Sequence, residues 1–126
     1  MSREIKFRAF IKATNGNRGM LFSGKDLSGF FSMKKKLNKF GVMQYTGLKN
    51  KNGDDIYEDD ICKKENGDIV LVVFVNYCWI LIQKYEYESY KKGFIYGSEE
   101  TLRYYTSNLR ELEVIGNIHE DPELMN

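Results

Sequence analysis

Acidic residues crowd one short stretch in the middle of the chain, at Asp54, Asp55, Glu58, Asp59 and Asp60. Carboxylate oxygens are the ligands that hard divalent cations prefer. An EF-hand loop built on Gly53 as its sixth residue would place Leu48 at its first ligand position, so that motif fails. We therefore interpret these carboxylates as solvated groups at a turn or as partners of N-terminal lysines, and we predict no metal site.

A second candidate for ligand chemistry is residues 19–26, GMLFSGKD, which come close to the phosphate-binding pattern GxxxxGK[ST]. The last position of that pattern needs a hydroxyl to bind magnesium beside the phosphates, whereas Asp26 supplies a carboxylate. Met20, Leu21 and Phe22 are typical of a strand rather than of a loop that cradles phosphates. We predict no nucleotide site and no other cofactor.

His119 is the only histidine, and Cys62 and Cys78 are the only cysteines. A zinc site with several histidines is therefore excluded, and these three side chains are too few ligands for a closed zinc site. A nucleophilic Cys–His pair stays open, although nothing in the spacing supports it. We interpret His119 as structural, predict no catalytic residue, and expect a protein that is not an enzyme.

The cysteines and the apolar runs bear on where the protein works. Cys62 and Cys78 lie far apart without a paired spacing, so we expect the two reduced, buried thiols of a cytosolic protein. No basic-then-apolar signal segment opens the chain. The longest apolar run, residues 69–75, is far shorter than the ~20 residues that span a bilayer. These observations predict a soluble, cytoplasmic protein.

The formal net charge of +1 hides a segregation of charge along the chain. Residues 1–51 hold twelve Lys and Arg against two acidic residues, whereas residues 52–126 hold seven basic and sixteen acidic residues. Such asymmetry can mark a nucleic-acid surface, whose phosphate contacts would come from Arg3, Lys6, Arg8, Lys34, Lys35, Lys36 and Lys39. It can equally be self-complementary, with the two halves packed together or with one subunit's basic face on a neighbour's acidic face. We favour the self-complementary interpretation and expect a homo-oligomer.

Tyrosines gather between residues 84 and 105, at Tyr85, Tyr87, Tyr90, Tyr96, Tyr104 and Tyr105. Tyrosines beside basic residues can stack nucleic-acid bases. The four basic residues of this segment are cancelled by four acidic ones, however. We therefore interpret the segment as an aromatic sheet face that is buried in a core or in a subunit interface.

The elements that carry these residues begin with a predicted hairpin. Apolar and mostly basic residues alternate over residues 5–12, a period of two that indicates a half-buried strand. Asn15-Gly16 favours a type I′ turn, after which residues 20–22 return as a second strand. Residues 23–41 carry little pattern, and their lysine run is typical of a solvated face.

The rest of the chain consists of short apolar stretches separated by turn signals. We predict strands at residues 42–45, 61–64, 68–75, 78–83 and 114–118, with turns at 46–47, 52–53, 66–67 and 76–77. The Asp-Pro-Glu of residues 121–123 is typical of a helix start. These elements predict a single, mostly β domain. Its core is an SH3-like small barrel at residues 54–119, with an added basic N-terminal hairpin within residues 1–50 and a short C-terminal helical turn.

Three blocks of the sequence resemble the YopX family of phage and prophage proteins. They are residues 3–10 (REIKFRAF), 44–61 (QYTGLKNKNGDDIYEDDI) and 113–124 (EVIGNIHEDPEL), and they bracket essentially the whole chain in the family's order. The motif positions that we expect to be structural are Gln44, Tyr45, Thr46, Gly47, Leu48, Gly53, Ile56, Tyr57, Asp60, Ile61, Gly116 and Asn117. The resemblance implies a phage or prophage origin, a location in the bacterial host cell and an SH3-type barrel, and it implies no catalytic residue.

One departure from the family pattern bears on the backbone. Asp59 stands where the family usually has glycine, which often marks a positive φ. Aspartate is among the few other residues that tolerate this conformation, so we expect the turn to be kept. The residues as a whole favour a non-enzymatic, homo-oligomeric interaction module, with an accessory nucleic-acid-binding protein as the alternative.

Overall fold

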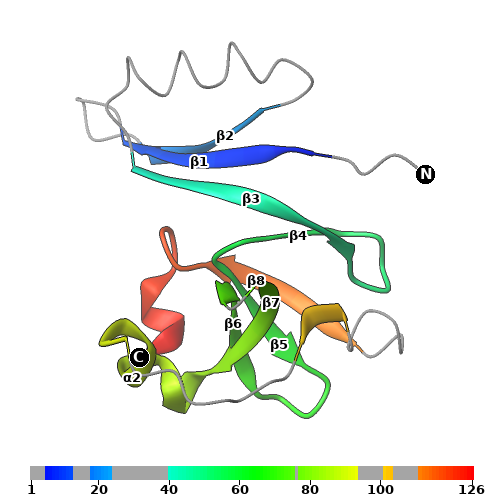
Figure 1. The fold of residues 1–126 in the computed structure, drawn as a ribbon, viewed down its shortest axis with the longest axis vertical. Helices are drawn as coiled ribbons and strands as arrows, with labels where there is room; N and C mark the ends of the chain where they lie inside the picture. Colours follow the sequence, from blue (N-terminus) through cyan, green and yellow to red (C-terminus); the bar gives the residue numbers. More distant parts are fainter. Residues whose placement is uncertain (1–4, 13–17, 24–39, 76, 94–100, 104–110) are drawn as a thin grey trace.

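The computed structural model describes residues 5–12, 18–23, 40–75, 77–93, 101–103 and 111–126. The described strands form two antiparallel sheets, which lie one above the other in Figure 1. The strand order is β2-β1-β3-β4 in the first sheet and β7-β6-β5-β8 in the second. The second sheet curls, and this mostly β architecture is consistent with the predicted small barrel.

The first sheet contains the predicted N-terminal hairpin. It is built from β1 (Phe7–Lys12), β2 (Arg18–Phe22), β3 (Phe40–Lys49) and β4 (Asp55–Tyr57). Strands β1 and β2 pair with Arg8 opposite Phe22, which confirms the hairpin, while its predicted Asn15-Gly16 turn lies outside the described residues. Because β1 also pairs with β3, the hairpin shares one sheet with the central part of the chain.

The turn predicted at Thr46-Gly47 is wrong, because both residues lie inside the continuous strand β3. Gly47 has a φ of +84°, and the pairing of β3 with β4 shifts register between Tyr45 and Lys49. A glycine with positive φ is as typical of a β-bulge as of a turn. Gly47 therefore marks an unusual backbone conformation, but that conformation belongs to a bulge within β3 and not to a turn. The chain turns back only at Gly53, whose φ is +88°, as Asn52-Gly53 predicts.

The second sheet is a three-stranded meander closed by a strand from the end of the chain. Strands β5 (Asp60–Lys64), β6 (Ile69–Val75) and β7 (Cys78–Gln83) follow one another, and β8 (Leu112–Asn117) returns beside β5. Gly67, with a φ of +94°, lies in the turn between β5 and β6, as Asn66-Gly67 predicts. Residues 70–73 of β6 are all buried, because both faces of this sheet are covered.

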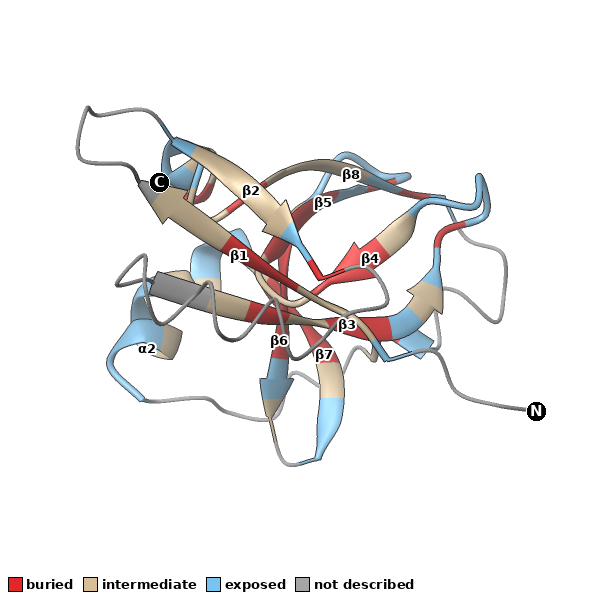
Figure 2. Cartoon of the chain, turned by 90° about the horizontal axis from the view of Figure 1, so that it is seen from above, coloured by how far each residue is buried: buried red, intermediate tan, exposed pale blue. Residues whose placement is uncertain are grey.

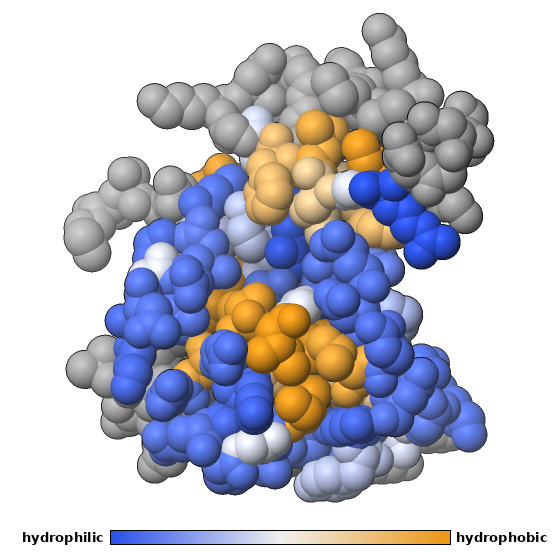
Figure 3. Space-filling view, turned by 180° about the vertical axis from the view of Figure 1, so that it is seen from behind, coloured by the Kyte–Doolittle hydropathy of each residue, from blue (hydrophilic) through white to orange (hydrophobic). Residues whose placement is uncertain are grey.

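Two hydrophobic clusters cover the two faces of the second sheet. On one face, Ile56 of β4 packs with Cys62 and Leu81 of the sheet. On the other face, Ile61 packs with Met125 near the C-terminus. Figure 2 shows the buried residues running along β5 and β6, and Figure 3 shows an apolar patch with a hydrophilic border on the half of the molecule that holds this sheet.

Short helical segments complete the described part of the chain: η1 (Lys84–Glu86), α2 (Tyr87–Lys91) and η2 (Pro122–Met125). The aromatic sheet face predicted for residues 84–105 is wrong for Tyr87 and Tyr90, which lie on α2 and pack against the second cluster. Tyr85 is 84% exposed, and Tyr96, Tyr104 and Tyr105 lie outside the described residues. Pro122 begins η2, as Asp-Pro-Glu predicts.

The two thiols differ in their surroundings. Cys62 is buried in the first cluster, as predicted. The predicted burial is wrong for Cys78, which is exposed because it begins β7 directly after a hairpin turn. In the described part of the chain, no helix has the length and the apolar character needed to cross a membrane.

Candidate functional site

Two of the seven basic residues predicted to contact phosphates bind carboxylates of the same chain. Lys6 Nζ lies 2.7 Å from Asp55 Oδ2, and Lys49 pairs with the other oxygen of that carboxylate. Burial raises the pKa of Asp55, but the two lysines outweigh this effect, so the pKa lies below its ordinary value. The remaining predicted phosphate contacts lie outside the described residues, at Arg3, Lys34, Lys35, Lys36 and Lys39.

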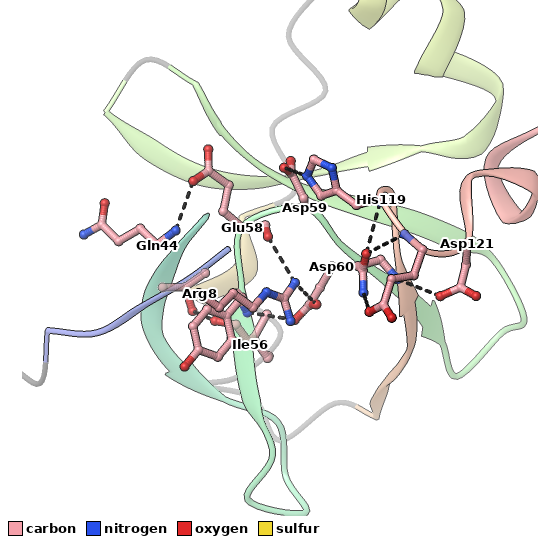
Figure 4. Close-up of polar contacts among 12 residues, drawn as sticks. Arg8, Gln44, Ile56, Glu58, Asp59, Asp60, His119 and Asp121 are labelled. Carbon is pink, nitrogen blue, oxygen red and sulfur yellow. Dashed lines mark hydrogen bonds and ion pairs between the residues drawn. The ribbon is translucent and has the colours of Figure 1, made fainter. Parts of the chain in front are cut away.

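Arg8 is the second of these residues, and it is buried between the sheets rather than solvated. Its Nη2 lies 2.6 Å from Asp60 Oδ1 and donates a second hydrogen bond to the carbonyl of Glu58 at 3.3 Å (Figure 4). The guanidinium also lies 4.6 Å from the centre of the Tyr57 ring. Burial raises the pKa of Asp60, and the nearby Arg8 opposes that rise. This pair therefore joins the basic and acidic parts of the sequence within one chain.

The acidic turn is joined to the end of β8 through Asp59. This residue has a φ of +70°, a backbone conformation that glycine adopts readily. His119 Nε2 lies 3.0 Å from Asp59 Oδ2 (Figure 4). The imidazole also stacks on the Phe10 ring of β1, with 5.7 Å between the ring centres. Since these contacts tie β1, the turn and the end of β8 together, His119 has the surroundings of a structural residue.

Several motif residues complete hydrogen bonds of the backbone. Thr46 Oγ1 donates to the carbonyl of Ile56 at 2.7 Å and accepts from the Leu48 amide at 3.1 Å. Asn117 Oδ1 accepts from the amides of His119 and Glu120 at 3.0 and 2.9 Å. Within the described ranges, no three His, Cys, Asp or Glu side chains come together as a group that could hold a metal ion.

A pocket of about 540 Å³ opens beside the hairpin that joins β6 and β7. Residues of β3, of this hairpin and of a short third segment line it: Thr46, Gly47, Leu48, Phe74, Tyr77, Cys78, Trp79, Thr101 and Arg103. This volume falls within the range that is usual for binding pockets. The lining combines three aromatic rings with one guanidinium.

Tyr77 is the least expected residue of this pocket. Because Val75 pairs with Cys78, positions 76 and 77 form the connection between the strands. Tyr77 has a φ of +66° and its residue is 94% exposed. The second position of such a two-residue turn usually carries glycine, because side chains are strained there. Tyr77 therefore exposes a large aromatic ring to water while its backbone has a positive φ, a conformation that disfavours side chains.

Two further aromatic residues flank Tyr77. Phe74 and Trp79 are cross-strand partners in the β6–β7 hairpin, and their ring centres lie 4.8 Å apart. Phe74 is 51% exposed, although it belongs to a strand whose central residues are buried. We call Phe74, Tyr77 and Trp79 the tip surface. Cation, aromatic and hydroxyl groups line the pocket beside it, and such groups suit recognition of a partner.

Sequence reasoning placed a turn at Asn76-Tyr77 but assigned no role to it. One signal was present: the chain uses Asn-Gly at residues 15–16, 52–53 and 66–67, and Asn-Tyr at 76–77. The replacement of the expected glycine by tyrosine marks this turn as different from the others. The lining from β3 and from Thr101 and Arg103 gave no comparable signal, because only the fold brings these segments together.

A comparison with protein families finds a match over nearly the whole chain. A family model described as YopX protein matches residues 6–126. This range includes both described sheets and every residue that lines the pocket. No curated protein matches the sequence significantly.

Proposed function

The chain belongs to the YopX protein family, and we propose that it is a non-enzymatic, homo-oligomeric interaction module that binds through the tip surface. The observation that carries this proposal is Tyr77, which is 94% exposed at a φ of +66°. Holding a non-glycine residue in that conformation costs about 1–3 kcal/mol. Strained residues persist where the surrounding structure holds them, and they cluster at binding and active sites.

The composition of the tip surface supports a protein partner. Tyrosine, tryptophan and arginine are the residues that contribute most at protein interfaces. Phe74 and Trp79 lie against each other beside Tyr77, and Arg103 lines the same pocket. An exposed aromatic group of this kind is buried when two proteins associate, which gives a driving force that does not depend on charge.

The ion pairs inside the chain support an interface that is not mainly ionic. Lys6 pairs with Asp55, and Arg8 pairs with Asp60, so part of the segregated charge is neutralised within one subunit. Association through the tip surface should therefore change little with salt, whereas association through basic and acidic faces would weaken as salt rises.

Sedimentation velocity at low and high salt tests the proposal. We expect the full chain to self-associate at micromolar concentration, with an affinity that salt does not lower. A monomer under both conditions would contradict it. Self-association that salt abolishes would place the interface on charged faces instead of on the tip surface.

Nucleic-acid binding is a second candidate, favoured by the same pocket. Aromatic rings beside Arg103 could stack bases, and Arg3, Lys34, Lys35, Lys36 and Lys39 could contact phosphates. Fluorescence anisotropy with short single- and double-stranded DNA and RNA distinguishes the two functions. Binding that falls steeply with salt would support this candidate, and no binding at ~50 mM salt would eliminate it.

The proposal includes the origin and the location that the family resemblance implies. These are a phage or prophage source and the cytoplasm of a bacterial host. Both stay predictions, and neither is needed for the argument from Tyr77.

A further inference from the structure

We propose that the pocket beside the tip surface is filled by the Tyr77 ring of a second copy of the chain. The exchange is reciprocal about a two-fold axis, so the assembly closes as a dimer. This inference rests on the proposed self-association, and it adds the occupant of the pocket and the number of subunits.

A projecting ring and an open pocket lie side by side on this surface. Tyr77 is 94% exposed, and it also lines the pocket of about 540 Å³. A two-fold interface brings the same patch of both copies together, so a patch must be complementary to itself. A ring next to a pocket meets this condition: when one Tyr77 enters the partner's pocket, the partner's Tyr77 lies at the first pocket.

The lining of the pocket suits a phenol. Leu48, Phe74 and Trp79 offer apolar and aromatic surface to the faces of a ring. Thr101 and Arg103 add a hydroxyl and a guanidinium, which suit the polar end of a tyrosine and its π face. The pocket thus offers contacts to both the ring and the hydroxyl of a tyrosine side chain such as Tyr77.

Each buried aromatic side chain removes roughly 150–250 Å² from water, so two exchanged tyrosines would form the centre of a small interface. The exposed half of Phe74 adds to that centre. Because each copy both gives and receives a ring in the same contact, no tip surface is left to bind a third copy, and a filament is not expected.

Two variants separate the projecting ring from the pocket. Tyr77→Gly removes the ring and leaves the other lining residues of the pocket in place, and glycine suits the positive φ of that position. Thr101→Phe keeps the ring and fills part of the pocket. Tyr85→Ala is a matched control, because Tyr85 is 84% exposed and does not line the pocket. Circular dichroism of each variant establishes that it is folded.

Sedimentation velocity of the full chain then tests the exchange. We expect the wild type and Tyr85→Ala to reach a dimer and no larger species. Tyr77→Gly and Thr101→Phe should each be monomeric alone. An equal mixture of these two should regain association through one of the two contacts, since the Tyr77 ring of the Thr101→Phe chain can enter the pocket of the Tyr77→Gly chain, where Thr101 is unchanged.

A second readout uses Cys78, which lines the pocket and is exposed. A short bismaleimide should join two wild-type chains through Cys78, and Cys78→Ser should abolish the product. Cys62 is an internal control, because burial raises the pKa of its thiol and shields it.

The outcomes distinguish this inference from the proposed function. Self-association that survives Tyr77→Gly, species larger than a dimer, or a mixture that stays monomeric would overturn the exchange while leaving self-association in place. A wild type that is monomeric at all concentrations would overturn both the exchange and the proposed self-association. This holds even if its tip surface binds a peptide of another protein.

Discussion

Arg8 of β1 and Asp60 of β5 form an ion pair of 2.6 Å whose side chains are only 9% and 2% exposed. The two residues belong to different sheets, so the pair joins the N-terminal hairpin to the curled sheet. Asp60 also accepts a hydrogen bond from the Tyr57 amide at 2.7 Å, so each of its two carboxylate oxygens has a donor. The pair thus fixes the position of the first sheet, whose strand β3 forms one wall of the pocket.

Replacing one member of this pair should destabilise the fold strongly. Arg8→Met would leave the Asp60 carboxylate buried without its counter-charge, and we expect a loss of about 3–5 kcal/mol in the free energy of unfolding. Lys6→Met is the control, because the pair of Lys6 with Asp55 is more exposed and should contribute less than about 1 kcal/mol. Urea unfolding measures both, and equal losses would contradict the role of the buried pair.

The positive φ of Asp59 predicts a difference between two substitutions. Asp59→Ala and Asp59→Gly both remove the carboxylate that contacts His119, but only glycine relaxes a φ of +70°. We expect the glycine variant to be more stable than the alanine variant by about 1–2 kcal/mol. Thermal unfolding of the two side by side is the measurement. An alanine variant as stable as the glycine variant would mean that this turn carries no strain.

Glu58 predicts a pH dependence of stability. Burial raises its pKa above the ordinary value of 4.5, although its carboxylate accepts a hydrogen bond from the Gln44 amide. A raised pKa in the folded state stabilises the protein below the unfolded pKa, and this contribution is lost as pH rises through the folded pKa. Glu58→Gln should therefore gain stability relative to wild type between about pH 4 and pH 7. Parallel unfolding curves across this range would contradict the prediction.

Gly116 on β8 should not accept a side chain. A Cβ there would lie 2.5 Å from Asp121 Oδ2 and 3.1 Å from Leu124 Cδ1, so the Asp121 side chain would have to shift. That carboxylate also accepts a hydrogen bond from the Asn117 amide at 3.3 Å. We expect Gly116→Ala to cost about 1–3 kcal/mol. Gly19→Ala is the control, because nothing lies within 4 Å of its Cβ; a Gly116 variant as stable as this control would be inconsistent with the packing.

The strands of the second sheet were predictable because their signals are local. Apolar runs, together with the turn signals at Asn66-Gly67 and Asn76-Tyr77, predict β6 and β7, and the structure confirms both strands. The burial of Arg8 was not predictable, because its alternation with apolar neighbours is the same for a solvated side chain as for one that meets Asp60 on another sheet. The bulge at Gly47 and the pocket were not predictable for the same reason, because each depends on which segments the fold brings together.

The most direct test of the central claim is Tyr77→Gly, measured for stability and self-association in the same preparation. Glycine suits the φ of +66°, and the ring it removes is almost fully in water, so thermal unfolding should show no loss of stability. Removal of an interface aromatic should weaken self-association by more than about tenfold in sedimentation velocity, while Tyr85→Ala leaves it unchanged. A Tyr77→Gly variant that associates like the wild type would contradict the account.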